Sequence, residues 1–280
     1  MKQGCSIELL YIRGASGATG SLFWVWLVAL SASQAIFNNK LHRVLRVALF
    51  GLAGATLFVG WIQGRSWASG YLPAGVALGA IIWLRSWKLG VLVAMAATAY
   101  LFLFNSRLVD SLIGSEIYSI DTRGEALRIL LFQVLPINPL LGLGPANYYW
   151  YTPLFPILGY YVKFNSHNQY MDLLMQTGVI GTACYLWLMA SIGFLGLRLV
   201  KQLPDGFTKA YAFGALGGLA GMMMAGAQGD WVIPFVYNIG MAGFRASVLG
   251  WIFLGGLMVI ERLEAAKPGS TTHDGVLHPS

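Results

Sequence analysis

Long apolar runs separated by short polar connections make up most of this chain. A transmembrane helix needs about 20 mainly apolar residues, and seven runs approach or reach that length. They occur at Ser21–Phe37, Val44–Ile62, Ser69–Leu84, Leu89–Phe104, Tyr170–Leu197, Lys209–Gln228 and Phe244–Ile260. Only Arg85-Ser86-Trp87-Lys88 separates the third run from the fourth, so we expect a tight helical hairpin there. The pattern predicts an all-α polytopic membrane protein with about seven transmembrane helices.

One connection, 105–166, is far longer than the others. Unstructured connections of more than about 15 residues are uncommon in compact proteins and are usually functional. We therefore expect 105–166 to carry the site or its lid. The pattern predicts one transmembrane domain over 1–260 and, because 261–280 is rich in Pro, Gly, Ser and Thr, a disordered tail there.

Composition and charge agree with a membrane protein and predict its orientation. Charged residues make up 10% of the chain, against about 25% in soluble domains. Ten of the 18 basic residues lie on one predicted side: Lys40, Arg43, Arg46, Arg85, Lys88, Arg198, Lys201, Lys209, Arg262 and Lys267. The positive-inside rule makes that side the cytoplasm, so the N-terminus and 105–166 lie outside. An outside N-terminus with no upstream span predicts a chain that is the C-terminal part of a longer protein. The net charge of +7 follows from this bias. Nucleic-acid binding would require a basic face on a soluble module, and the sequence predicts no such module, so nucleic acid is not an expected partner.

Polar residues collect at the start of the fifth run. Ser166 followed by Gln169 is a capping-box pattern, so we expect a helix to begin there with His167 in its first position. A neutral imidazole at this position can act as a general base; the competing interpretation is a capping or headgroup-level histidine. A polar stripe follows at helical spacing, formed by Asn165, Asn168, Gln169, Asp172 and Gln176. Such a stripe is costly in lipid unless it faces a site or a partner.

Two arginines lie in an amphipathic stretch within the long connection. The pair Thr122 and Glu125 predicts a helix start, and Pro136 ends the stretch. One apolar face is expected from Leu127, Leu130, Leu131 and Val134. Arg123 lies on that inward face, whereas Arg128 points sideways. An arginine against apolar surface needs an anion and matches phosphate bidentately; alternatively it snorkels to the headgroups.

A loop turned by glycine and proline follows, Asn138–Tyr148. Its Gly142-Leu143-Gly144 lacks the third glycine and the strand–helix context of a dinucleotide fingerprint. Aromatic residues surround the loop, namely Tyr148, Tyr149, Trp150, Tyr151, Tyr160 and Tyr161. Such a band forms either an interfacial belt or a surface on which sugars stack.

These motifs together resemble the bacterial O-antigen ligase/polymerase family, over about Arg13 to Ile260. The resemblance rests on the order and spacing of Asp121-Thr122-Arg123, Asn138-Pro139-Leu140-Leu141-Gly142-Leu143-Gly144-Pro145, His167-Asn168, Tyr170-Met171-Asp172-Leu173-Leu174 and Gly178-Val179-Ile180-Gly181. Gly64-Arg65-Ser66 is similar to the Ser-Arg-Gly turn of the family. The resemblance implies a fold of the type-C glycosyltransferase kind in the bacterial inner membrane, acting on its outer side. It also implies glycans carried on undecaprenyl diphosphate, a glycan or glycolipid acceptor, and chemistry without a metal or other cofactor.

The expected reaction is glycan transfer to an acceptor hydroxyl. His167 is the predicted base, and Arg123 and Arg65 are the other predicted catalytic residues, which hold the diphosphate. Arg128, Asn168, Asp172 and Tyr148 are expected to bind substrate. The few outer acidic residues form no tight cluster, so no metal site is predicted. The acceptor, whether lipid A core, another repeat unit or a protein side chain, stays open.

Two other functional classes also fit a polytopic chain. A transporter or channel usually carries ionisable residues at mid-membrane depth, whereas the mid-span positions here are apolar or glycine. Asp230 and Pro234 interrupt the last hairpin and could line a cavity. A non-catalytic subunit of a polysaccharide-export complex is the third possibility. We expect one set of glycines, Gly214, Gly217, Gly218 and Gly221, to serve close helix packing.

Overall fold

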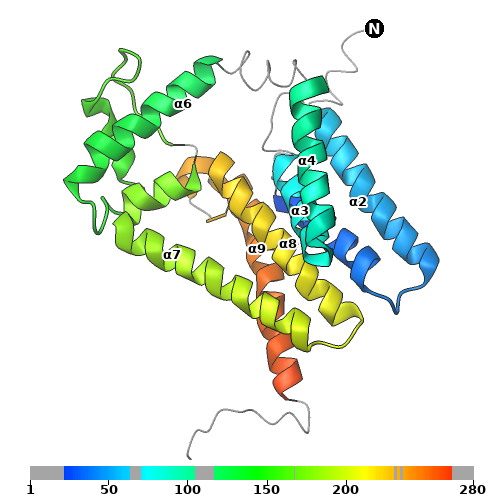
Figure 1. Cartoon of the computed structure of the whole chain (residues 1–280). Helices are drawn as coiled ribbons and strands as arrows, with labels where there is room; N and C mark the ends of the chain where they lie inside the picture. Colours follow the sequence, from blue (N-terminus) through cyan, green and yellow to red (C-terminus); the bar gives the residue numbers. More distant parts are fainter. Residues whose placement is uncertain are drawn as a thin grey trace, which may run out of the picture.

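The computed structural model describes residues 22–63, 71–104, 117–166, 168–229, 232–233 and 236–266, and helices dominate this part of the chain (Figure 1). The helices are Leu22–Phe37, α2 (Arg43–Gln63), α3 (Leu72–Arg85), α4 (Trp87–Phe104), α6 (Ile117–Ile129), α7 (Gln169–Gln202), α8 (Phe207–Gln228) and α9 (Val236–Ala265). Short π and 3-10 turns between α6 and α7 cover Leu130–Val134, Leu135–Ile137, Tyr148–Trp150 and Thr152–Leu154. Within the described ranges the only strand-like pairing is the isolated bridge between Ile157 and Tyr160.

Each of the seven predicted apolar runs coincides with a helix. The predicted hairpin is confirmed, because Ser86 alone separates α3 from α4 and the two helices contact each other. Among the described residues, three helical stretches are long and apolar enough to cross a membrane, Arg43–Gly60, Gln169–Gln202 and Phe207–Gln228. An all-α membrane protein is therefore supported, while the number of seven crossings stays a prediction.

Helix α8 lies at the centre of the bundle and contacts α3, α7 and α9 (Figure 1). Its glycine face allows this close approach, as the sequence predicted. A Cβ at Gly217 would lie 2.6 Å from Ile81 Cγ1, and one at Gly218 would lie 2.6 Å from Trp26 Cη2, both shorter than real Cβ atoms tolerate. The glycines at these positions therefore let the backbones pack where any side chain would separate them.

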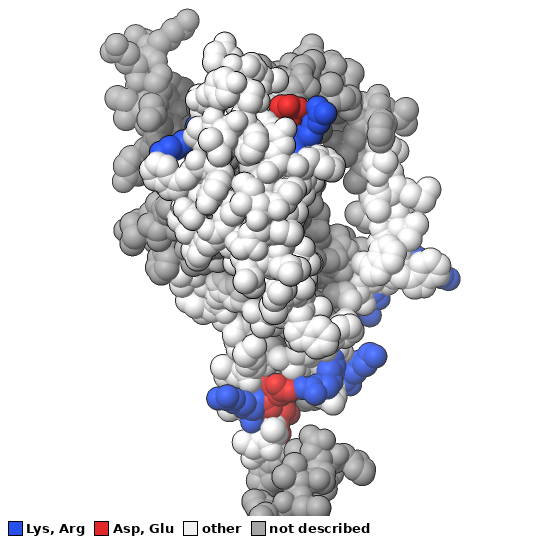
Figure 2. All heavy atoms as spheres, turned by 90° about the vertical axis from the view of Figure 1, so that its left-hand side faces the viewer, with Lys and Arg blue, Asp and Glu red and all other residues white. Residues whose placement is uncertain are grey.

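On the face that Figure 2 shows, most charged side chains lie at an upper and a lower level with a largely uncharged band between them, and a few basic side chains at the right edge lie in between. At one level Arg198 of α7 pairs with Glu261 of α9, and Lys209 Nζ lies 3.0 Å from Asp205 Oδ1 in the α7–α8 turn. The hydrogen bond from Lys209 holds the pKa of the Asp205 carboxyl below its usual range. Both basic residues named here, Arg198 and Lys209, belong to the group predicted to face the cytoplasm, and an uncharged band is what a bilayer requires.

Candidate functional site

Helix α6 and the turns after it pack against the first part of α7, but not as the sequence predicted. The predicted start at Thr122 is wrong, because α6 already includes residues from Ile117 onward. The buried face consists of Ala126, Ile129, Leu130 and Val134, whereas Leu127 is 41% exposed. The chain widens into a π turn after Ile129, so later residues no longer follow the 100° step of an α-helix. The stretch does end at Pro136, which lies in the following 3-10 turn.

Helix α7 begins at Gln169, not at the capping box predicted from Ser166. Asn168 is the N-cap, and its side-chain oxygen accepts from the backbone N–H of Tyr170 at 3.0 Å and of Met171 at 3.2 Å. Gln169 Oε1 instead accepts from Val232 N and Ile233 N, at 3.2 and 2.9 Å, in the α8–α9 connection. Asn and Ser are comparable N-caps, so local preference does not select between Ser166 and Asn168. The contacts of Ser166 with Asp172 and of Gln169 with Val232 and Ile233 favour the cap at Asn168. The first helical position is therefore Gln169, two residues later than predicted.

Three of the five residues of the predicted polar stripe lie in α7 and face the protein interior, whereas Asn165 and Asn168 precede the helix and are half-buried. Gln169, Asp172 and Gln176 are at most 1% exposed. Gln176 Oε1 accepts from Ala146 N at 3.1 Å. Buried polar groups of this kind are tolerated when they are hydrogen-bonded, and here they tie α7 to the loop before it and to the α8–α9 connection.

Asp172 joins three segments of the site through one oxygen. Tyr148 OH and Ser166 Oγ both donate to Asp172 Oδ1, the second at 2.7 Å. Tyr148 OH also accepts from Ser166 N at 3.0 Å, and Ser166 Oγ accepts from Asn168 N at 3.0 Å. Tyr148 and Asp172 are fully buried. Both were expected to bind substrate, but this burial favours a positioning role, in which they hold the segment that contains Ser166 and Asn168.

The loop 138–144 forms a clasp around a kink in α7. Gly178 has non-helical backbone angles, so Met175 O and Gln176 O lose their usual partners four residues later, Val179 N and Ile180 N. The loop supplies a new hydrogen-bond partner for each of these four groups, and we call the four resulting hydrogen bonds the clasp. Leu143 N donates to Met175 O at 2.8 Å, Gly144 N to Gln176 O at 3.0 Å, Val179 N to Pro139 O at 2.9 Å, and Ile180 N to Leu140 O at 3.3 Å. The kink therefore leaves these four groups hydrogen-bonded although the helix ladder is interrupted.

Two glycines make the clasp possible. Gly178 has φ 65° and ψ −168°, a region essentially restricted to glycine. A Cβ there would lie 2.6 Å from Leu141 N and closer still to the Leu140 carbonyl. Gly142 has φ 71°, and its Cβ would lie 2.5 Å from the backbone carbon of Gln176. The sequence analysis placed these glycines in a loop, in a helix and in the family motif set, but it predicted no contact between them. The length of the apolar run that includes Gly178 could have indicated a kink. At 1.5 Å per residue, α7 is about 51 Å long, against a hydrocarbon core of about 30 Å.

Among the other predicted site residues that the structure describes, Asn168 joins this network through its N–H bond to Ser166 Oγ, and Arg128 pairs elsewhere. Arg128 lies on an exposed surface, with 75% of its side chain accessible, and pairs at 3.9 Å with Glu125. Asn168 Nδ2 donates to Ala227 O at 3.1 Å, which connects the cap to α8. Lys163 Nζ lies 3.1 Å from the Trp150 ring centroid, so the predicted aromatic band includes a cation–π contact.

His167, Arg65 and the side chain of Arg123 lie outside the described part of the chain. The described residues contain no group of three or more His, Cys, Asp or Glu suited to a metal ion.

We expect Asp172→Ala to destabilise the protein by about 1–3 kcal/mol, because the fully buried Tyr148 hydroxyl loses this acceptor. The half-buried Ser166 hydroxyl can still donate to Asn168 O at 2.8 Å. Asp172→Asn is the matched control, since its amide oxygen can still accept from Tyr148 and Ser166. Thermal unfolding of the purified protein in detergent measures both. An Asp172→Ala protein as stable as the wild type would show that the network contributes nothing to the fold.

Comparison with known proteins identifies the region that contains this network. A family model described as O-antigen ligase matches residues 46–186. The matched region includes both halves of the clasp and the Tyr148–Asp172–Ser166 network. No curated protein and no solved structure gives a match.

Proposed function

This chain belongs to the O-antigen ligase family, and on that premise we propose that it transfers a glycan from undecaprenyl diphosphate to an acceptor hydroxyl on the outer side of the bacterial cytoplasmic membrane. Family membership makes it a membrane-bound glycosyltransferase or ligase of polysaccharide biosynthesis. The observation that carries the finer proposal is the set of hydrogen bonds that the two neighbours of position 167 make. Ser166 and Asn168, its two neighbours, are hydrogen-bonded to each other, and Ser166 is also bonded to Tyr148 and Asp172.

His167 is the proposed general base. It takes the proton of the acceptor hydroxyl as the acceptor oxygen attacks the anomeric carbon of the donor glycan. The bond between that carbon and the diphosphate oxygen breaks, and undecaprenyl diphosphate leaves with the electron pair. Proton transfer by a positioned base typically contributes about 10²–10⁴-fold. The role of Tyr148, Asp172 and Ser166 is to hold the backbone on both sides of this base.

Arg123 and Arg65 are proposed to hold the diphosphate and to stabilise the charge that develops on it. A guanidinium presents a planar fork that matches two phosphate oxygens, and it does so without a metal ion. Arg123 precedes Ala126 by three residues within α6, the spacing of one helix face, and Ala126 is buried against the site. Arg128 and Asn168 are proposed to contact the substrate at the edge.

Arg123→Lys should strongly reduce transfer while leaving membrane insertion unchanged, because lysine keeps the charge and loses the bidentate fork. Transfer is measured with a lipid-linked glycan donor in membranes that contain equal amounts of each variant. Near-normal activity of Arg123→Lys together with an inactive Arg123→Ala would mean that only a general positive charge is needed.

We also propose that residues 1–260 form one transmembrane domain with 105–166 outside and 261–280 inside. A cysteine introduced at Leu158, which is 44% exposed in that segment, should react with an impermeant maleimide added to intact spheroplasts. A cysteine at Lys201, near the end of α7, should react only after the membrane is opened. The two native cysteines, Cys5 and Cys184, are replaced by serine first, since Cys184 is an exposed free thiol and Cys5 lies in the segment predicted to be outside. The reverse labelling pattern would contradict an extracytoplasmic site.

Glycan analysis of a deletion strain tests the proposed function itself. Loss of glycan attachment indicates a ligase, attachment of single units indicates a polymerase, and complementation with the wild-type chain should restore the normal pattern. Unchanged glycans, together with solute uptake in reconstituted vesicles, would instead support the transporter.

A further inference from the structure

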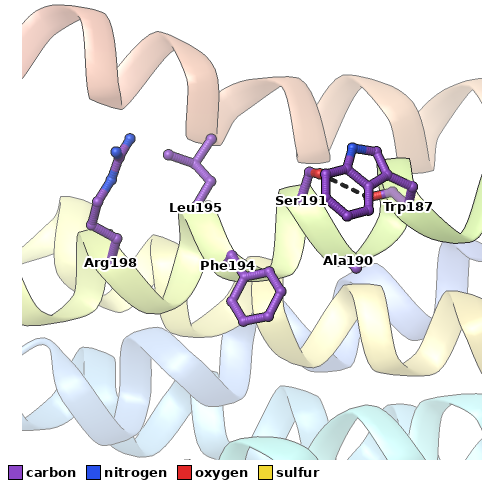
Figure 3. A pocket seen from close by; sticks show the side chains of 6 residues that line it. All are labelled: Trp187, Ala190, Ser191, Phe194, Leu195 and Arg198. Carbon is purple, nitrogen blue, oxygen red and sulfur yellow. Dashed lines mark hydrogen bonds between the residues drawn. The ribbon is translucent and has the colours of Figure 1, made fainter.

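Two adjoining grooves along α7, which we call the cleft, take no part in the proposed transfer reaction and have the features of a lipid site. One groove is lined by α7 residues alone, and the other lies between α7 and α9. Figure 3 shows Trp187, Leu195 and Arg198 on the side of α7 that faces the α9 ribbon. Two cavities of about 340 and 300 Å³ open along α7, and Ser191 and Leu195 line both of them. Trp187, Ser191 and Leu195 are spaced four residues apart, so they lie on one face of α7. The two grooves therefore adjoin each other along α7, and α9 lines only the second.

Each groove has a guanidinium in its lining. Arg198 lines one cavity, and Arg262 lines the other. Between them they offer two positive charges against the single carboxylate in the linings, Glu261, which pairs with Arg198. That pairing leaves Arg198 with further donors, because a guanidinium has five N–H groups and 56% of this side chain is exposed. The end of the cleft is thus net positive and suited to a phosphate.

We propose that this cleft binds an anionic diacyl phospholipid, with one acyl chain in each groove and the phosphate held by Arg198 and Arg262. The rest of the lining is mainly apolar or small, including Trp187, Ala190 and Phe194 in one groove and Leu188, Ile192 and Met258 in the other. Basic pockets between transmembrane helices bind the headgroups of acidic lipids. This inference goes beyond the proposed function and does not depend on it.

The length of the cleft argues for a lipid rather than a partner helix. The eleven-residue interval from Trp187 to Arg198 corresponds to about 16 Å at 1.5 Å per residue. One leaflet of the hydrocarbon core is about 15 Å thick, half of roughly 30 Å. The grooves therefore run from the level of the arginines to the middle of the bilayer, as an acyl chain does. A transmembrane helix of a partner would need a groove across both leaflets.

Native mass spectrometry of the full chain in detergent tests the proposal. The protein is titrated with phosphatidylglycerol and, separately, with phosphatidylcholine that has the same acyl chains. The wild type should bind phosphatidylglycerol more tightly. The double variant Arg198→Gln/Arg262→Gln should lose roughly 25-fold in this affinity, about fivefold for each arginine near a charged headgroup. Lys88→Gln, which removes an exposed basic residue of α4, is the matched control and should change nothing.

Two further variants separate the lipid site from a merely structural ion pair. Glu261→Gln removes the carboxylate that competes for Arg198, so it should tighten phosphatidylglycerol binding. Ser191→Trp fills both grooves and keeps every charge, so it should weaken binding of the lipid. Equal binding of the two lipids by the wild type would overturn the proposal. So would Glu261→Gln weakening binding as much as Arg198→Gln, or Ser191→Trp leaving it intact, or a protein dimer that Ser191→Trp abolishes.

Discussion

Glycan transfer should fall by about 10²–10⁴-fold when His167 is replaced by alanine, the usual effect of removing a general base. The amount of protein in the membrane should stay the same, because the hydrogen bonds that we describe around this position are made by Ser166, Asn168, Tyr148 and Asp172. The measurement is transfer from a lipid-linked donor in membranes normalised for protein content.

Two controls isolate the proton transfer at His167. His167→Gln can form hydrogen bonds but cannot accept a proton at neutral pH, so it should be nearly as inactive as the alanine variant. His42→Ala removes an exposed histidine outside the site and should leave the rate unchanged. Full activity of His167→Gln would restrict His167 to positioning and would leave the activation of the acceptor to another group.

Gly178→Ala should abolish transfer and destabilise the protein by roughly 2–6 kcal/mol, the sum of a backbone forced into a glycine-only region and of overpacking. The methyl group would collide with the Leu140 carbonyl and Leu141 N, so the clasp has to open. Opening it releases four backbone groups of α7 and moves the network that includes Asp172. Transfer assays and thermal unfolding in detergent measure the two effects.

Gly144, in the same loop, provides a control for the Gly178 substitution. Gly144 also has a positive φ, 91°, but nothing lies within 4 Å of its Cβ position. Gly144→Ala should therefore cost only about 1–2 kcal/mol of backbone strain and leave measurable transfer. Gly54→Ala in α2 meets nothing and has ordinary angles, so it should be neutral or slightly stabilising. If Gly178→Ala behaved like Gly144→Ala, close contact with Leu140 would not be what the site requires.

Local apolar content was sufficient to locate the helices of the bundle. All seven apolar runs are helices, and the hairpin at Ser86 and the glycine face of α8 also follow from short-range patterns. These features depend on residues within one or two turns of each other. For that reason the sequence contained the information for them directly.

The arrangement of the site depends on contacts between distant positions, which local patterns do not contain. Gln169 looked like half of a capping box, but its side chain bonds to residues 63 and 64 positions later. Gly178 looked like a helix residue, and its kink becomes understandable only with Leu140 beside it. The family resemblance had placed both segments in one motif set, and the clasp gives a physical reason why they occur together.

The clasp also has a consequence for the biosynthesis of this protein. Residues 138–144 leave the ribosome before residues 175–180, so the partners of the interrupted helix already exist when the kink is made. A backbone group without a hydrogen-bond partner is costly wherever water is excluded, and the kink frees four such groups. Insertion of α7 with the loop already attached avoids that penalty. The order of the two segments along the chain is thus itself a feature that membrane insertion favours, and a permuted chain that translated α7 first should insert less efficiently.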